Sequence, residues 1–155
     1  MRMALGVVVV GAMFSATSVY AQQPAAPAGQ AQAVSNARLF PNDGGMVLNF
    51  IKPDKSADFE AVIAKLKEAL AKSDKPERKQ QAAGWKVFKS PDPAGANVLY
   101  VFIIDPSMKT ADYQISNIIA EALPTEANEI LKKYAECYAQ GMNIVNLNLI
   151  QDLGK

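Results

Sequence analysis

The alternation of hydrophobic and polar positions is clearest between Gly45 and Leu70, where it predicts a strand followed by an amphipathic helix. Successive side chains of a strand point to opposite faces, so Met46, Leu48 and Phe50 should share one face of a strand over residues 46–51. A Lys-Pro-Asp corner follows. Beyond it, apolar residues recur at three- and four-residue spacing, which is typical of a helix with one buried stripe: Phe59, Val62, Ile63, Leu66 and Leu70.

A hairpin is predicted next, from residues 81–89 and residues 98–104. The second of these segments, VLYVFII, is apolar at every position, whereas a half-exposed strand would alternate. It should therefore be a central strand that is covered on both faces. The turn between the two strands is long and contains two prolines and a glycine, SPDPAGAN.

The C-terminal part of the chain predicts two further helices and a last strand. A helix is expected to start at Thr110 and to bury the apolar residues of 115–122. A third helix is expected to be capped by Thr125 and to end at Gly141, since glycine commonly follows the last turn of a helix. Residues 143–150, NIVNLNLI, alternate as a half-buried edge strand does.

The resulting order is β-α-β-β-α-α-β, which indicates an α+β fold of the ferredoxin-like, split β-α-β type. Its four-stranded antiparallel sheet would carry helices on one face only. The apolar segment 98–104 then needs cover on the other face, and a homodimer formed through that sheet face would supply it.

The N-terminus has the three parts of a secretory signal peptide over residues 1–21. Arg2 is followed by an apolar run. Val19-Tyr20-Ala21 then resembles the small-residue cleavage site of a signal peptide. We expect a flexible Ala/Gln/Pro-rich leader over residues 22–43 and a single domain over residues 44–152. The mature protein should be exported, to the periplasm or outside the cell, and should not stay in the membrane after cleavage.

The amino-acid composition limits which kinds of binding site and catalytic site this protein can contain. Lys and Arg number 16 against 15 for Asp and Glu, so a net charge of +1 gives no basic footprint for nucleic acid. Histidine is absent, which removes the commonest metal ligand and the usual near-neutral acid or base. The single cysteine, Cys137, is expected to be a buried, inert thiol, and the alternative is a thiol that cross-links two subunits or reacts in an oxidising compartment. We expect no metal and no cofactor.

The stretch VLNFIKPDKSADFEAVIAKL, with its acidic-aromatic pair Asp58-Phe59, resembles the start of antibiotic-biosynthesis-monooxygenase-like domains. The later stretch VLYVFIIDPSMKTADY resembles their third strand and second helix. The resemblance covers most of residues 46–149 as a pattern of elements. It implies a domain that pairs as a dimeric α/β barrel.

The resemblance also implies candidate residues. The family includes cofactor-free oxygenases that use an Asn on the first strand and a Trp in the barrel, and Asn49 lies in a comparable place. Trp85, the only tryptophan, falls on the second strand rather than where the Trp of the family would lie. The haem-degrading members add a His ligand, which this chain lacks.

Each candidate also has a structural interpretation. Asn49 would orient an aromatic substrate, or it would simply hydrogen-bond to nearby backbone. Trp85 would line a ligand pocket with Tyr100 and Phe102, or it would fill core or interface. Asp105 would act as a base at a cavity mouth, or it would only shape a turn.

Two functions from different classes follow. The first is an exported, non-enzymatic module that binds a small apolar ligand or a protein partner. The alternative is a cofactor-independent monooxygenase-like enzyme acting on an aromatic small molecule. The enzyme requires Asn49 and Trp85 to point into one enclosed space. The sequence favours the module, because the residues available for chemistry are few.

Overall fold

The computed structural model describes residues 36–154, so the expected signal peptide (1–21) and most of the expected leader (22–43) lie outside the described residues. Four strands and four α-helices make up the domain, and a short 3-10 helix over Pro53–Lys55 precedes the first of them. In chain order the elements are β1 (Gly44–Ile51), α1 (Ser56–Lys72), α2 (Pro76–Ala83), β2 (Trp85–Lys89), β3 (Val98–Ile104), α3 (Ile115–Ala122), α4 (Ala127–Cys137) and β4 (Tyr138–Leu147).

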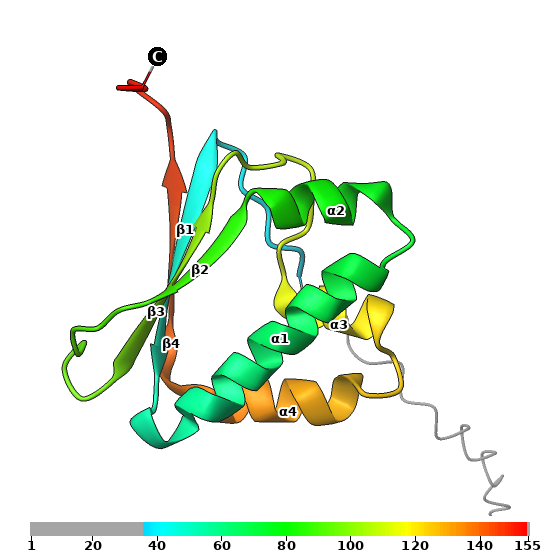
Figure 1. The fold of residues 1–155 in the computed structure, drawn as a ribbon, viewed down its shortest axis with the longest axis vertical. Helices are drawn as coiled ribbons and strands as arrows, with labels where there is room; N and C mark the ends of the chain where they lie inside the picture. Colours follow the sequence, from blue (N-terminus) through cyan, green and yellow to red (C-terminus); the bar gives the residue numbers. More distant parts are fainter. Residues whose placement is uncertain (1–35, 155) are drawn as a thin grey trace, which may run out of the picture. The chain divides into compact units, whose positions relative to one another are not determined.

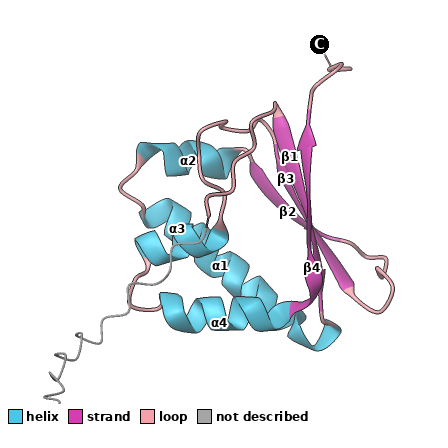
Figure 2. Cartoon of the chain, turned by 180° about the vertical axis from the view of Figure 1, so that it is seen from behind, coloured by secondary structure: helices cyan, strands magenta, loops and turns pink. Residues whose placement is uncertain are grey.

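The strands form one antiparallel, open sheet in the order β2-β3-β1-β4. The helices lie on one side of this sheet, and the other side is free of them (Figures 1 and 2). The α+β class and the four-stranded antiparallel sheet are therefore as predicted from the sequence. Between residues 36 and 154, no helix has the length and apolar character needed to cross a bilayer.

Register fixes which side chains meet the helices. Antiparallel residues that lie directly opposite each other share a face, and Val47 pairs with Phe102 while Gly45 pairs with Ile104. Val47, Phe102 and Ile104 are at most 2% exposed, and they belong to the hydrophobic core cluster. This helix-covered face of the sheet holds the hydrophobic core.

The opposite face, which we call the open sheet face, is also apolar. Met46 lies between Ile103 of β3 and Val145 of β4, and Val101 pairs with Phe88 of β2. The remaining positions follow by alternation along each strand. Its apolar side chains are Met46, Leu48, Phe50, Phe88, Leu99, Val101, Ile103, Val145 and Leu147.

Strand β1, helix α1 and strand β3 were predicted correctly from the hydrophobic pattern. The prediction was wrong for residues 76–83, which form α2 rather than a charged connection and the start of a strand. Pro76 is suited to the first turn of a helix, where its missing N–H costs nothing. The residues that α2 buries are Arg78 and Gln81, so its inward face carries no hydrophobic pattern.

The end of the chain also differs from the prediction. Helix α4 ends at Cys137, and Gly141 lies inside β4 instead of ending the helix. Tyr138 has an extended backbone, with φ −74° and ψ 130°, and it begins the strand. Its hydroxyl bonds to Asn49 on β1, which holds this residue on the sheet.

Helix α3 begins at Ile115, later than the expected cap at Thr110. Hydrogen bonds to the Asp112 carboxylate explain why the helix starts later than expected. This carboxylate accepts hydrogen bonds from the backbone N–H groups of Arg38 and Gln114, both at 2.8 Å, and thereby holds the preceding loop in place. Helix α4 likewise begins at Ala127, after the expected cap.

The packed part of the chain begins before residue 44. Phe40 is fully buried, and its ring meets Tyr113 edge-on at 5.3 Å between centroids. The ring lies directly on Gly45 of β1, where an added Cβ would overlap the ring carbons of Phe40. Glycine is required here for close approach.

We predict that Gly45→Ala lowers the free energy of unfolding by about 1–3 kcal/mol, because the methyl group displaces the Phe40 ring in a packed core. Gly141→Ala is the matched control, since an added Cβ meets nothing within 4 Å at that position of β4. Urea unfolding followed by circular dichroism measures both. Equal stability of the two variants would contradict the close packing of Phe40.

Candidate functional site

Asn49 is fully buried on the helix-covered face of β1. Its Nδ2 donates to the carbonyl oxygens of Val47 at 3.3 Å and Tyr100 at 3.2 Å. Its Oδ1 accepts a hydrogen bond of 2.9 Å from the Tyr138 hydroxyl. The amide is therefore engaged at both ends, which supports the structural interpretation of Asn49.

The polar chain from Asn49 continues through two tyrosines. The hydroxyls of Tyr138 and Tyr134 are hydrogen-bonded at 2.6 Å, and the two rings meet edge-on at 5.2 Å. Burial raises the pKa of both phenols, and the neighbouring phenol adds to the rise at Tyr138. Both side chains are neutral at physiological pH and act as hydrogen-bonding groups within the core.

Tyr100 and Phe102, two of the predicted ligand residues, lie in an aromatic cluster around Phe59 of α1. They are 2% and 1% exposed, and their ring centroids lie 4.7 and 6.2 Å from that of Phe59. The Tyr100 hydroxyl donates to Glu60 at 2.6 Å. These two residues are packed as core.

Trp85 lies at the start of β2 on the helix-covered face. Its ring meets those of Phe102 and Tyr113 edge-on, with centroids at 6.0 and 5.4 Å. It also forms a wall of a concave site of about 320 Å³, which we call the Trp85 groove. The groove is lined by Ile63, Leu66, Lys67, Leu70, Ala82, Trp85 and Val87. Asn49 does not line it, so this groove does not unite the two residues that the oxygenase hypothesis requires.

The surroundings of two other candidates, Asp105 and Cys137, favour structural roles. Asp105 is exposed where β3 ends. Cys137 is fully buried at the end of α4, and its thiol donates to the Lys133 carbonyl at 3.1 Å. Burial raises the pKa of the Cys137 thiol, which disfavours the reactive thiolate. Burial and a raised pKa both agree with the prediction of an inert thiol.

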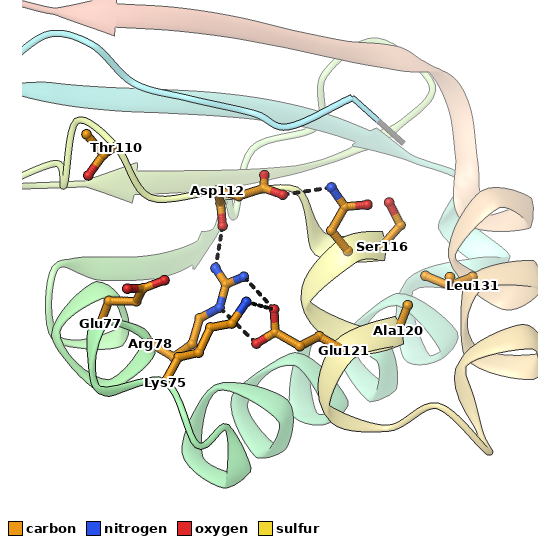
Figure 3. Close-up of a pocket in the computed structure, with 10 residues that line it drawn as sticks. Lys75, Glu77, Arg78, Thr110, Asp112, Ser116, Ala120, Glu121 and Leu131 are labelled. Carbon is orange, nitrogen blue, oxygen red and sulfur yellow. Dashed lines mark hydrogen bonds and ion pairs between the residues drawn. The ribbon is translucent and has the colours of Figure 1, made fainter. Parts of the chain in front are cut away.

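A polar pocket of about 550 Å³ lies among α2, the loop before α3, and α3 itself (Figure 3). We call it the Arg78 pocket. Figure 3 shows the guanidinium of Arg78 between Asp112 and Glu121, with Lys75 reaching the same Glu121 carboxylate. Its lining residues are Lys75, Glu77, Arg78, Thr110, Asp112, Ser116, Asn117, Ala120, Glu121 and Leu131.

Arg78 is only 4% exposed, and its donors are used within the domain. Nη1 donates to Gln81 Oε1 at 2.9 Å and to the Asp112 carbonyl at 2.7 Å. Nη2 and Nε face the two Glu121 oxygens at 3.1 and 3.5 Å. Arg78 therefore ties α2 to α3 and to the loop before α3, which is a structural role.

The Glu121 carboxylate is held in its charged form. Burial opposes the charge, but hydrogen bonds from Arg78, Lys75 and Ser73 outweigh it and lower the pKa of Glu121 to about 2. This carboxyl is too acidic for a proton shuttle near neutral pH. The pocket was not predicted from the sequence. The only local indication was Pro76 followed by Glu77, a common start of a helix.

Within residues 36–154, no group of His, Cys, Asp and Glu side chains is placed to hold a metal ion. Comparison of the chain with protein-family models, curated proteins and solved structures finds no match. The resemblance to the monooxygenase-like domains therefore stays a prediction, and function must be argued from the domain itself.

We predict that Glu121→Gln destabilises the protein at pH 7 by about 1–3 kcal/mol, because it leaves the buried Arg78 without its counter-charge while Glu121 itself is 28% exposed. The pKa of Glu121 is lowered in the folded state. Its contribution is therefore complete above its unfolded value of about 4.5 and is lost as the pH falls toward about 2.

The difference in unfolding free energy between wild type and Glu121→Gln should therefore shrink as the pH is lowered from 4.5 to 2. Urea titrations at several pH values measure this difference. Glu129→Gln is the control, because that side chain is 77% exposed and pairs only with Lys133 across one helical turn. A difference that does not change with pH would contradict the pairing.

We also predict that Tyr138→Phe costs about 1–2 kcal/mol, because it leaves Asn49 Oδ1 buried without a donor. Tyr100→Phe should cost less, since its hydroxyl partner Glu60 has a side chain that is 53% exposed. Urea unfolding of both variants tests this order, and the reverse order would refute it.

Proposed function

We propose that this chain is an exported, non-enzymatic interaction module whose sheet pairs with that of a second copy, as a ferredoxin-like domain that closes into a dimeric α/β barrel. The observation that carries the proposal is the open sheet face. Monomeric proteins rarely present large contiguous apolar patches to water. On the open sheet face, the two central strands β1 and β3 carry only apolar side chains. Phe88 of the edge strand β2 lies beside them and is 53% exposed.

The distribution of polar residues on this face favours a second copy as the partner. Lys86 lies opposite Ile103 at the β2 edge, and Asn143 lies opposite Leu48 at the β4 edge. The central strands β1 and β3 place only apolar side chains there. Two such faces related by a twofold axis can therefore meet without bringing charges to the middle of the contact.

The surroundings of the candidate residues support a non-enzymatic role. An oxygenase of the resembled family would need the Asn49 amide free for substrate, and this amide is bonded to two carbonyls and to Tyr138. The proposal of export rests on the signal-like sequence of residues 1–21.

The mass of the purified protein in solution, from size-exclusion chromatography with light scattering, tests the proposal. We expect a dimer for the wild type. Val101→Lys should give a folded monomer, because a lysine opposite Leu48 and Phe88 cannot be buried in the contact without about a hundredfold or greater loss of affinity.

Ala135→Lys is the control, since this residue is exposed on α4, on the helix side of the sheet. It should stay dimeric. A monomeric wild type, or a Val101→Lys variant that remains dimeric, would refute pairing through this face.

A further inference from the structure

The Trp85 groove lies on the helix side of the sheet, away from the open sheet face, and its lining has the character of a ligand site. Ligand sites are concave, about 300–1,000 Å³ in volume, and mostly apolar with a few polar groups. The groove has about 320 Å³ between α1, α2 and β2. It suits a small molecule.

The groove has an apolar floor that belongs to the core. Leu66 and Leu70 of α1 are 3% and 5% exposed, and the Trp85 ring stands beside them. Val87 of β2, at 38%, remains open to solvent at the side. An apolar chain or ring placed here would remove from water mainly its own surface and the exposed side of Val87, at about 25 cal/mol per Å².

A buried donor beside the groove has no acceptor. The indole Nε1–H of Trp85 is shielded from water and bonds to no atom of residues 36–154. Buried donors are nearly always satisfied, and leaving one unpaired is costly. Because this nitrogen is shielded from water, it does not face the open groove, and another part of the ring lines the groove.

A single charged side chain lines the groove, and its charge is uncompensated. Lys67 forms no ion pair within the described part of the chain, whereas the other two lysines of α1 do. Lys65 pairs with Glu68 and Glu126, and Lys72 pairs with Glu68. An anionic group would therefore be favoured at the Lys67 rim.

We propose that the Trp85 groove binds a small apolar molecule with an acidic head, such as a medium-chain carboxylic acid. The apolar part would lie on Leu66, Leu70 and Trp85, and the carboxylate would lie beside Lys67. This site goes beyond the pairing proposed above and does not depend on it, because the two surfaces are on opposite sides of the sheet.

Octanoate is a suitable probe, and Trp85 is a suitable reporter because it is the only tryptophan. Titration of the purified protein with octanoate should give a saturable change in tryptophan fluorescence. It should also shift the single indole N–H resonance in a ¹⁵N–¹H spectrum. Octanol, which has the same chain without the charge, should bind more weakly.

Lys67→Met should raise the dissociation constant for octanoate about two- to fivefold, as expected for an exposed ion pair, and should leave that for octanol unchanged. Lys132→Met is the control, because this exposed lysine is on α4 and does not line the groove. Ala82→Leu places a larger side chain in the groove and should abolish the saturable fluorescence response to octanoate.

Absence of a saturable response to octanoate would overturn the proposal. So would equal binding of octanoate and octanol with no effect of Lys67→Met, because the acidic head would then have no role. The Lys67 variant alters only an exposed side chain, so the test stands even if Ala82→Leu does not fold. A monomeric wild type would refute the dimer without affecting this result.

Discussion

The apolar character of both faces of β1 and β3 is the constraint on which the rest of this structure depends. A single layer of helices covers Val47, Phe102 and Ile104, and the same two strands turn Met46, Leu48 and Val101 to the other side. Because the side-chain period of a strand is two, no shift of register could hide both sets from water under one layer. The proposal of a second copy follows from this imbalance.

The covered side of the sheet is held by two kinds of interaction. An aromatic cluster around Phe59 fills the region between α1 and the central strands. Polar networks anchor the edges of that layer. Asn49 joins β1 to the start of β4 through Tyr138, and Arg78 joins α2 to α3 through Glu121. Among residues 36–154, the buried polar side chains are thus explained by the architecture, with the unpaired Trp85 donor as the exception.

Hydrophobic periodicity was sufficient to predict β1, α1 and β3, where burial coincides with apolar residues. It failed for α2, because the residues that face inward there are Arg78 and Gln81. It also failed at the junction of α4 and β4, where Tyr138 has an extended backbone and its hydroxyl bonds to Asn49. Asn49 was selected as a candidate from its place on the first strand, and its hydrogen bonds to two backbone carbonyls agree with the structural interpretation. The Arg78 pocket could not be predicted, since its members are distant in sequence and are brought together only by the fold.

The central claim is that the open sheet face is buried in the native, paired protein. The dependence of the melting temperature on protein concentration tests it most directly, because unfolding of a dimer is coupled to dissociation and unfolding of a monomer is not. The account predicts that the melting temperature rises steadily as the protein is concentrated. A melting temperature that is the same at all concentrations would contradict it.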